Sequence, residues 1–353
     1  MKVLITGGAG FVGSSIARLL KRDQGDMDVV AFDNLARRGS ELSVGRLKSF
    51  GAGFVHGDIR CWEDLEALGR FDWIIDCSAE PSVQAGYYGG ARSLVRTNLD
   101  GTAHCLELAR KYDAGLTFLS TSRVYPIEGL RALPLEARAD RLVIPDDQSG
   151  PGWSSNGISA SFSMEGPRSL YGATKYASEL LAEEYASMYD LPIVTNRCGV
   201  LAGPWQMGKV DQGFIVLWAA RHFFGGELSY QGFGGHGRQV RDVLHIHDLY
   251  SLVAMQMAAP TDHKGMRYCV GGGPGNSVSL LELTKMCEQR GRRPVAIGSI
   301  PETHPADVPY YCTDLGDVTS RTGWKPERSI EDILDHVFDW LSANETALEP
   351  ILG

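Results

Sequence analysis

The chain has 353 residues, of which 43% are hydrophobic and 22% charged, which is ordinary globular composition for one large domain or two modest ones. A net charge of -9 without a basic tract argues against a nucleic-acid partner, and no apolar run approaches the length of a membrane span. The N-terminal stretch MKVLITGGAG breaks into glycines too early for a signal peptide, and the 7 cysteines form no CxxC pair, so we expect free thiols and a cytoplasmic protein.

The start of the chain predicts a dinucleotide-binding turn. The apolar run KVLIT (2–6) leads into Gly8, Gly10 and Gly13 in GxGxxG register, and a helical pattern follows. Such glycines let the backbone approach a pyrophosphate, whose charge then meets the N–H groups of a helix N-terminus. Asp33 ends the second apolar run, where a carboxylate accepts both ribose hydroxyls and repels the extra phosphate of NADP. We therefore predict NAD as the cofactor, although two arginines just after Asp33 soften that repulsion.

Short apolar runs alternate with helical segments through the first two hundred residues. The expected strands after the first are residues 28–33, 53–57, 72–77, 116–121 and 192–197. Runs that are apolar throughout are typical of parallel strands covered on both faces. We therefore predict an α/β fold, a doubly wound parallel sheet of the Rossmann type, with a smaller C-terminal substrate lobe. The chain closes on an amphipathic helical pattern over residues 330–341, which predicts packing.

Two domains are expected. Residues 1–200 form the NAD-binding domain, to which residues 240–262 return, and residues 201–239 and 263–353 form the substrate-binding lobe. Residues 138–168, rich in glycine, serine and proline, interrupt the alternation. They are interpreted either as a surface loop or partly disordered insertion, or as a cap over a site.

The stretch SLYGATKYASE (169–179) places Tyr171 and Lys175 on one face of a helix. Free tyrosine titrates near ~10, so it needs help to act as a base. A lysine ammonium ~4 Å away, at an effective dielectric of ~20, is worth about 4 kcal/mol, or about three pKa units at most. Tyr171 is thus a candidate general base towards a sugar or alcohol hydroxyl, which Thr121 or Ser122 would hold.

Together these motifs resemble the extended short-chain dehydrogenase/reductases, the group of nucleotide-sugar epimerases and dehydratases, over nearly the whole chain. The resemblance implies that Thr121, Tyr171 and Lys175 are catalytic, with Thr121 preferred over Ser122 by its spacing from the tyrosine of "VY". Ser122 would then lie at the substrate. The implied cofactor-binding positions are Gly7, Gly10, Phe11, Val12, Gly13, Asp33, Asn34, Asp58, Ile59, Asn98, Tyr171 and Lys175. Asp58 and Ile59 would lie against the adenine. The resemblance also implies a homodimer through helices near 92–111 and 171–189.

Within this family, several stretches resemble the CDP-paratose 2-epimerases. They are FDNLARRG, FVHGDIR, the insertion ending in SLYGATK, DQGFIVLW and GRQVRDVLHIHDL. This resemblance implies NAD-dependent inversion of C2 in a CDP-linked sugar through a transient keto intermediate. A nucleotide-sugar 4-epimerase, a 4,6-dehydratase and a non-catalytic NAD-binding protein are the alternatives. Dehydratases carry an Asp-Glu pair where this chain has Ser122 and Arg123, which disfavours elimination.

Four positions depart from the pattern of that subgroup. Glu80 replaces a glutamine, Asp76 a histidine and Pro126 a glycine, and ETHPADVPYYCTD lacks an arginine that relatives aim at the nucleotide. Arg238 and Arg241 remain as candidate ligands of the substrate's diphosphate, because a guanidinium can bind phosphates bidentately.

The stretch HIHD (245–248) resembles a set of metal ligands. It supplies two imidazoles without a third partner nearby in sequence. We expect a buried histidine and an aspartate that caps the next helix, and no metal site.

Overall fold

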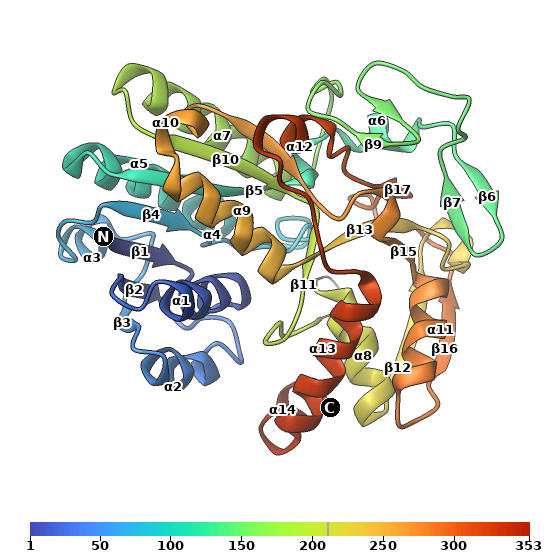
Figure 1. Cartoon of the computed structure of the whole chain (residues 1–353). Helices are drawn as coiled ribbons and strands as arrows, with labels where there is room; N and C mark the ends of the chain where they lie inside the picture. The colour runs from blue at the N-terminus through green and yellow to red at the C-terminus, as the bar shows by residue number, and fades with distance from the viewer. Residues whose placement is uncertain (210–211) are drawn as a thin grey trace. The chain divides into compact units, whose positions relative to one another are not determined.

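The computed structural model describes residues 1–209 and 212–353 and divides into two compact units (Figure 1). Unit 1 comprises Met1–Val124, Leu170–Arg197 and Leu249–Tyr268, and unit 2 comprises Tyr125–Ser169, Cys198–Asp248 and Cys269–Gly353. Asp211, the first residue of DQGFIVLW, lies outside the described residues. No helix in the two described ranges is both long enough and apolar enough to cross a membrane.

A 7-stranded sheet runs through unit 1 in the order β14-β10-β5-β4-β1-β2-β3. Its strands are β1 (Lys2–Thr6), β2 (Asp28–Asp33), β3 (Gly53–His56), β4 (Trp73–Asp76), β5 (Gly115–Thr121), β10 (Ile193–Cys198) and β14 (Arg267–Val270). β1 pairs in parallel with both β2 and β4, so the strand order runs outward in both directions from β1. This arrangement confirms the predicted doubly wound parallel sheet.

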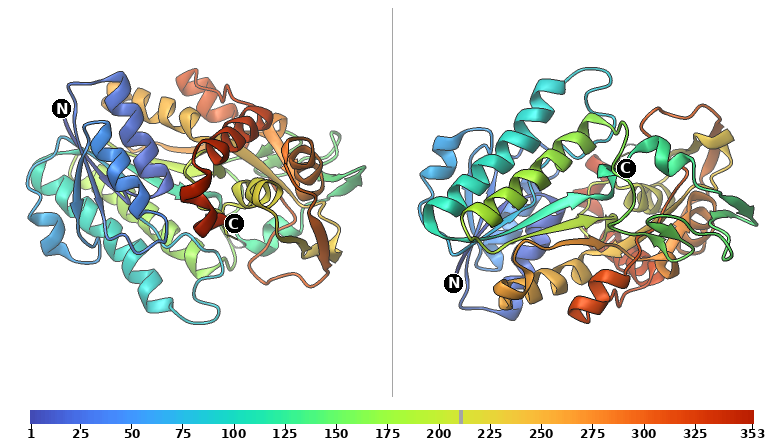
Figure 2. Two further views of the ribbon diagram at one scale, coloured as in Figure 1. Left: turned by 90° about the horizontal axis from the view of Figure 1, so that it is seen from below. Right: turned by 90° about the horizontal axis from the view of Figure 1, so that it is seen from above.

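Helices cover both faces of this sheet. They are α1 (Phe11–Asp23), α2 (Glu41–Ser49), α3 (Trp62–Glu66), α4 (Ala91–Val95), α5 (Gly101–Tyr112), α7 (Leu170–Met188), α9 (Ile246–Ala258) and α10 (Pro260–His263). A π-helical turn, Arg96–Asp100, joins α4 to α5. In Figure 2, α5 and α7 lie on one face of the sheet and α1 and α9 on the other.

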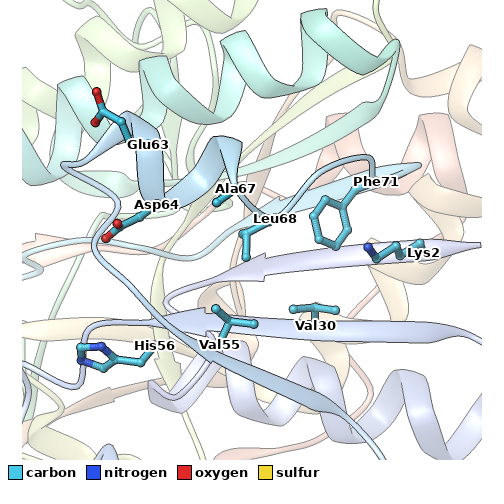
Figure 3. Close-up of a pocket in the computed structure, with 9 residues that line it drawn as sticks. All are labelled: Lys2, Val30, Val55, His56, Glu63, Asp64, Ala67, Leu68 and Phe71. Carbon is cyan, nitrogen blue, oxygen red and sulfur yellow. The ribbon is translucent and has the colours of Figure 1, made fainter.

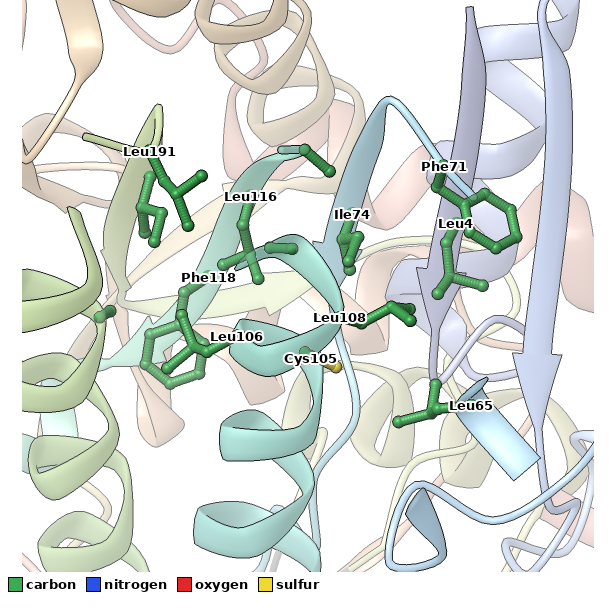
Figure 4. Close-up of a cluster of buried hydrophobic side chains, with 14 of the residues drawn as sticks. Leu4, Leu65, Phe71, Ile74, Cys105, Leu106, Leu108, Leu116, Phe118 and Leu191 are labelled. Carbon is green, nitrogen blue, oxygen red and sulfur yellow. The ribbon is translucent and has the colours of Figure 1, made fainter. Parts of the chain in front are cut away.

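The core explains why the strand sequences are apolar throughout. Every residue of β5 is buried, and Leu116 and Phe118 of that strand pack in one cluster with Leu106 and Leu108 of α5 (Figure 4). A strand covered on both faces has no solvent side on which polar residues would alternate. The position of β5 inside the sheet thus follows from its sequence.

Unit 2 is built around β13 (Val240–His245), which pairs with β11, β15 and β17. The other strands are β6 (Glu136–Arg138), β7 (Arg141–Val143), β8 (Trp153–Ser154), β9 (Gly157–Ile158), β11 (Val200–Ala202), β12 (Glu227–Gln231), β15 (Ser277–Ser279), β16 (Ala296–Ile300) and β17 (Tyr310–Tyr311). The helices are α6 (Ile127–Arg131), α8 (Phe214–Phe224), α11 (Leu280–Arg290), α12 (Gly316–Thr322), α13 (Ile330–Ala343) and α14 (Glu345–Leu352). α13 is the amphipathic helix predicted over 330–341, and it begins at a capping box formed by Ser329 and Asp332.

The stretch 138–168 is folded and belongs to unit 2. Antiparallel pairing joins β6 to β7 and β8 to β9. The backbone of Ile158 exchanges hydrogen bonds with Cys312 and Asp314, and Arg141 donates to Glu282 and to the carbonyl of Ser277. These bonds hold the stretch against unit 2, so it is not the disordered insertion that its composition allowed.

The observed units therefore differ from the expected domain boundaries. Residues 125–169 pack in unit 2 rather than with the rest of 1–200, and the return to unit 1 covers 249–268 rather than 240–262. Unit 2 is not the smaller of the two. The physical reason is the set of backbone bonds described above, which no local sequence pattern encodes.

Candidate active site

The glycine-rich turn after β1 is shaped to admit a phosphate-bearing ligand. Gly7 has a φ of +61°, and a Cβ there would lie 2.8 Å from the carbonyl oxygen of Cys77. A Cβ on Gly13 would lie 2.4 Å from the carbonyl oxygen of Gly7. Only glycine fits at both positions, which keeps the turn pressed against the start of α1 and leaves the backbone accessible.

The first turn of α1 provides the matching electrostatics. Gly10 is its N-cap and contributes no side-chain cap, and the first turn, which includes Phe11, Val12 and Gly13, contains no acidic residue. The N–H groups and the positive end of the helix dipole there favour an anion. The residues predicted from GxGxxG therefore fit the pyrophosphate of a dinucleotide.

Asp33 ends β2 and is tied to this turn. Its Oδ2 accepts a hydrogen bond from the backbone N–H of Ala9 at 3.1 Å, and its Oδ1 accepts one from Leu35 at 2.7 Å. Burial raises the pKa of Asp33, although these backbone bonds oppose the shift. Asp33 thus positions the turn, and its recognition of ribose hydroxyls stays a prediction.

The residues predicted to lie against the adenine form a small ionic cluster. Asn34 donates to Asp58 at 3.1 Å, and Arg60 forms an ion pair with Asp58 at 2.5 Å. Hydrogen bonds from Arg60 hold the pKa of Asp58 well below its usual range. Ile59 is buried, and its carbonyl oxygen lies 2.8 Å from Nδ1 of His104. Arg60 was not predicted as part of this cluster, because an arginine two residues after an aspartate does not by itself predict an ion pair.

Asn98 lies in the π-helical turn between α4 and α5 and is fully buried. Its side-chain amide accepts from the N–H of Glu80 at 2.8 Å and donates to the carbonyl of Glu80 at 3.1 Å. It also donates to Thr174 of α7 at 3.3 Å. Asn98 therefore fastens the loop after β4 to α7, and a direct cofactor contact stays a prediction. π-helical turns are frequent at functional sites.

Asp76, which stands where a histidine was expected, is a structural carboxylate. It is fully buried and accepts hydrogen bonds from the hydroxyls of Thr6 and Thr102, each at 2.8 Å, and from the N–H of Ser78 at 3.2 Å. These donors satisfy a charge that would otherwise be costly to bury. The departure from the family pattern is thus accommodated by two threonines.

The three predicted catalytic residues belong to unit 1 and are all buried. Tyr171 and Lys175 lie in the first turns of α7, which packs on β5 and on the 3-10 turn Ser122–Val124. Thr121 is the last residue of β5, and its Oγ1 accepts from the N–H of Arg123 at 3.2 Å. The groups that the sequence separates by fifty residues thus lie on elements that pack against each other.

The ammonium of Lys175 lies over an aromatic ring. Its Nζ is 4.2 Å from the ring centroid of Phe118, and the side chain is 2% exposed. The negative face of a ring favours a cation, so Phe118 helps to keep a positive charge in a dry site. Sequence reasoning missed Phe118, since an aromatic residue in an apolar strand predicts only core packing.

The predicted phosphate ligands belong to unit 2. Arg241 is paired with Asp307 at 2.8 Å and also donates to the carbonyls of Val240 and Val308. Arg238 is exposed. Any substrate phosphate would have to compete with Asp307 for Arg241, and the role of both arginines stays a prediction.

His245 of the HIHD stretch contacts one histidine within the stretch and one outside it. Nδ1 of His245 accepts from the N–H of His247 at 3.0 Å, and its Nε2 is 3.2 Å from Nδ1 of His336. Within 1–209 and 212–353 no group of three potential ligands could hold a metal ion. Asp248 does not cap α9 as expected, because α9 begins earlier, at Ile246; its carboxylate instead accepts from Arg328.

We predict that the buried His245 makes unit 2 sensitive to acid. Burial, and secondarily the rings of His247 and His336, lower the pKa of His245 to about 3. An unfolded histidine titrates near ~6.5, so below that pH only the unfolded chain takes up this proton. The contribution of the neutral His245 to the free energy of unfolding is fully present well above pH ~6.5. It falls by about 2 kcal/mol between pH 7 and pH 5. Urea unfolding at both values should show this fall, and His245→Gln should reduce it; an equal fall in the variant would contradict the assignment.

A separate groove in unit 1 is lined by residues of β1, β2, β3 and α3 and of the segment after α3 (Figure 3). Lys2 and Phe71 lie at one end, and His56, Glu63 and Asp64 lie at the other. None of the predicted catalytic or cofactor residues lines it. We assign no function to this groove.

Comparisons with known proteins cover nearly the whole chain. Residues 3–271 match the model of the NAD dependent epimerase/dehydratase family. The chain is 30% identical to CDP-paratose 2-epimerase of Salmonella typhi over 97% of this chain and 100% of that protein. It is 28% identical to dTDP-glucose 4,6-dehydratase of Streptomyces niveus over 99% and 96%, respectively. A dTDP-glucose 4,6-dehydratase from Streptomyces venezuelae, solved with NAD bound, has a TM-score of 0.78 at 26% identity over 99% of this chain and 100% of its own.

Proposed function

Because the chain belongs to the NAD-dependent epimerase/dehydratase family, we propose that it is an epimerase that inverts C2 of a CDP-linked sugar. The observation that carries this proposal is the buried pair Tyr171 and Lys175 on α7, with the ammonium over Phe118 and a threonine ending the adjacent strand. The similarity to a CDP-paratose 2-epimerase supports the choice of carbon and nucleotide.

The proposed reaction uses a proton relay within unit 1. Thr121 holds the sugar hydroxyl at C2, and the phenolate of Tyr171 accepts its proton. Lys175 stabilises that phenolate, since an ammonium nearby lowers the pKa of a phenol. The turn after β1 and Asp33 would hold NAD, whose nicotinamide would supply a reversible two-electron acceptor for the hydride of C2. The keto sugar turns over in the pocket before C2 is reduced on its opposite face. Tyr171 then gives its proton back to the oxygen, so the site ends as it began.

Elimination of water is the less favoured reaction. A 4,6-dehydratase needs a further acid and base next to the catalytic threonine, and this chain has Ser122 and Arg123 there. The N–H of Arg123 donates a hydrogen bond to Oγ1 of Thr121, and this bond fixes the 3-10 turn that carries Ser122 and Arg123. A 4-epimerase would use the same three catalytic groups, so the two reactions differ in which carbon of the bound sugar faces Tyr171.

The experiment that tests the proposal is a substrate panel. The purified protein is incubated with CDP-, UDP-, GDP- and dTDP-sugars, and products are identified by NMR. We expect a CDP-sugar to be converted to its C2 epimer. A 4-keto-6-deoxy product from any of them would make the protein a dehydratase, and no conversion of any sugar would favour a non-catalytic binder.

The cofactor prediction is tested by titration. We expect NAD to bind much more tightly than NADP, because the Asp33 carboxylate would accept ribose hydroxyls and repel a 2′-phosphate. Asp33→Asn should narrow the difference by removing the repulsion. Equal affinity of the unmodified protein for both cofactors would contradict this role of Asp33.

We also propose a cytoplasmic homodimer that pairs through the outer faces of α5 and α7. Large apolar side chains are exposed on or just after α7, with Leu180 at 47%, Met188 at 67% and Tyr189 at 42%. Such a contact would cover these exposed apolar side chains. All 7 cysteines are free, as expected in a reducing compartment.

Light scattering tests the assembly. Leu180→Asp is expected to convert a dimer into a monomer, because it would bury a charge at the contact. Met255→Asp is the matched control, since Met255 is 38% exposed on α9. A monomer across micromolar concentrations for the unmodified chain would rule out this interface.

A further inference from the structure

A buried ion pair in unit 1 has no part in the reaction proposed above. The side chains of Glu179 and Arg197 are each 1% exposed. Nε of Arg197 is 3.0 Å from both carboxylate oxygens of Glu179, and Nη2 is 2.7 Å from Oε2. An ion pair removed from water gives little net stability compared with apolar packing, so stability alone does not explain it. The pair joins α7 to the sheet, which suggests a role in holding the helix in place.

The carboxylate of Glu179 connects α7 to three neighbouring strands. Ser120 of β5 donates to Oε1 at 2.5 Å, and Arg197 is on β10. Arg267, the first residue of β14, has Nη1 3.7 Å from Oε2. β14, β10 and β5 are adjacent in the sheet. The Glu179 side chain therefore restrains α7 against sliding parallel to these strands and against shifting sideways over them.

The same helix face and the same strand carry the proposed catalytic groups. Tyr171, Lys175 and Glu179 follow one another at intervals of four residues, and all three are buried. On β5, Ser120 directly precedes Thr121. Any sliding of α7 along β5 would therefore move the phenol and the ammonium away from the threonine.

We propose that Glu179, held by Arg197 and Ser120, is a positioning residue that fixes α7 against β5 and thereby aligns Tyr171 and Lys175 with Thr121. This inference rests on the proposed catalytic roles of those three residues. Arg197 also compensates the charge of Glu179, so the ammonium of Lys175, one turn away, is not drawn towards that carboxylate.

The first test removes one arm of this network. Ser120→Ala leaves the ion pair intact but deletes the hydrogen bond from β5. Turnover is expected to fall by roughly tenfold, as small misplacements of reacting groups do, with little change in KM or in NAD affinity. The rising limb of the plot of kcat against pH should shift to higher pH, because a phenol less closely paired with its ammonium is harder to ionise.

Thr117→Val is the matched control. Thr117 is also buried on β5, and its hydroxyl accepts from Nε1 of Trp73 at 3.1 Å, a bond between two strands rather than between strand and helix. This variant should leave turnover and the pH profile unchanged. If Ser120→Ala behaves like the control, or if both variants lose turnover equally, the positioning role is overturned.

A second variant removes the pair altogether. Replacing it with apolar residues, Glu179→Leu with Arg197→Met, is a change that folded proteins often tolerate. It should slow turnover at least as much as Ser120→Ala; a folded double variant with normal turnover would overturn the proposal. Ultraviolet titration of the Tyr171 phenol, taken as the difference from Tyr171→Phe, supplies a readout that needs no substrate.

These outcomes separate the two proposals. If Tyr171→Phe retains normal turnover, the proposed reaction fails. If Tyr171→Phe is inactive while Ser120→Ala and the double variant behave like the unmodified protein, only the positioning role fails.

Discussion

Tyr171→Phe is expected to lower turnover by ~10²–10⁴-fold, the effect typical of removing a general acid–base group. Tyr171 is only 8% exposed, and the change deletes one hydroxyl without opening space in α7. Folding and NAD binding should therefore stay close to those of the unmodified protein. The loss should appear in kcat rather than in KM, because the phenol acts on the proton and not on the sugar as a whole.

Two further variants define what the phenol needs. Lys175→Met removes the buried ammonium but keeps the length of the side chain. It should slow turnover and shift the rising limb of the plot of kcat against pH to higher pH. Tyr250→Phe, which deletes a hydroxyl bonded to Asp23 at 2.9 Å, is the control and should leave turnover unchanged. Near-normal turnover of Tyr171→Phe would refute the assignment of Tyr171 as the base.

Gly13→Ala is expected to weaken NAD binding by about ten- to a hundredfold. The new Cβ would lie 2.4 Å from the carbonyl oxygen of Gly7 and 2.8 Å from Cα of Gly8, and both are backbone atoms that cannot rotate away. Overpacking of this kind costs about 1–3 kcal/mol, and each 1.4 kcal/mol is tenfold in affinity. The strain would fall on the turn that we propose to face the pyrophosphate, so cofactor binding should suffer first.

Gly45→Ala is the control for this effect. Gly45 lies within α2, is exposed, and a Cβ there would have no neighbour within 4 Å. Alanine favours a helix over glycine by roughly 0.5–1 kcal/mol, so this variant should be slightly more stable and bind NAD normally. Unchanged NAD affinity in Gly13→Ala, measured by calorimetry, would contradict the close approach of turn and helix.

Most of the sheet of unit 1 was predictable because its signals are local, whereas its edge strand β14 was not predicted. The run KVLIT, the glycines after it and Asp33 at the end of the next run lie close together in sequence, and β1 and β2 match the predicted bounds. Parallel strands covered on both faces are apolar throughout, so each one stands out from its flanks. Helix α7 and the helix over 330–341 were also evident, from the spacing of their buried residues.

The contacts that complete the site were not predictable, because they join distant segments. Asn98 is bonded to Glu80 and Thr174, Lys175 lies over Phe118, and Glu179 is paired with Arg197. Each of these side chains has an ordinary interpretation in its own stretch of sequence. Only the tertiary arrangement shows which partner it meets.

Unit 2 was predicted least well for the same reason. Its strands are short, and β13 pairs with β11, β15 and β17, which come from separate parts of the chain. The β6–β7 and β8–β9 hairpins have no apolar periodicity, and they are held by backbone bonds to Arg238, Cys312 and Asp314, which are distant in sequence. The pairing of Arg241 with Asp307 was equally hidden, and it changes how a phosphate could be bound.

In the proposed reaction the sugar is oxidised and then reduced at one carbon, and the same hydride returns to that carbon. The direct measurement is to run the reaction of the active CDP-sugar in deuterated water and to locate deuterium in the product by NMR. We expect a C2 epimer with C2 largely unlabelled, because a hydride carried by NAD would not exchange with solvent. One deuterium at C2 would show direct deprotonation of carbon, and deuterium at C5 of a 4-keto-6-deoxy sugar would show elimination. Either result would refute oxidation and reduction at C2.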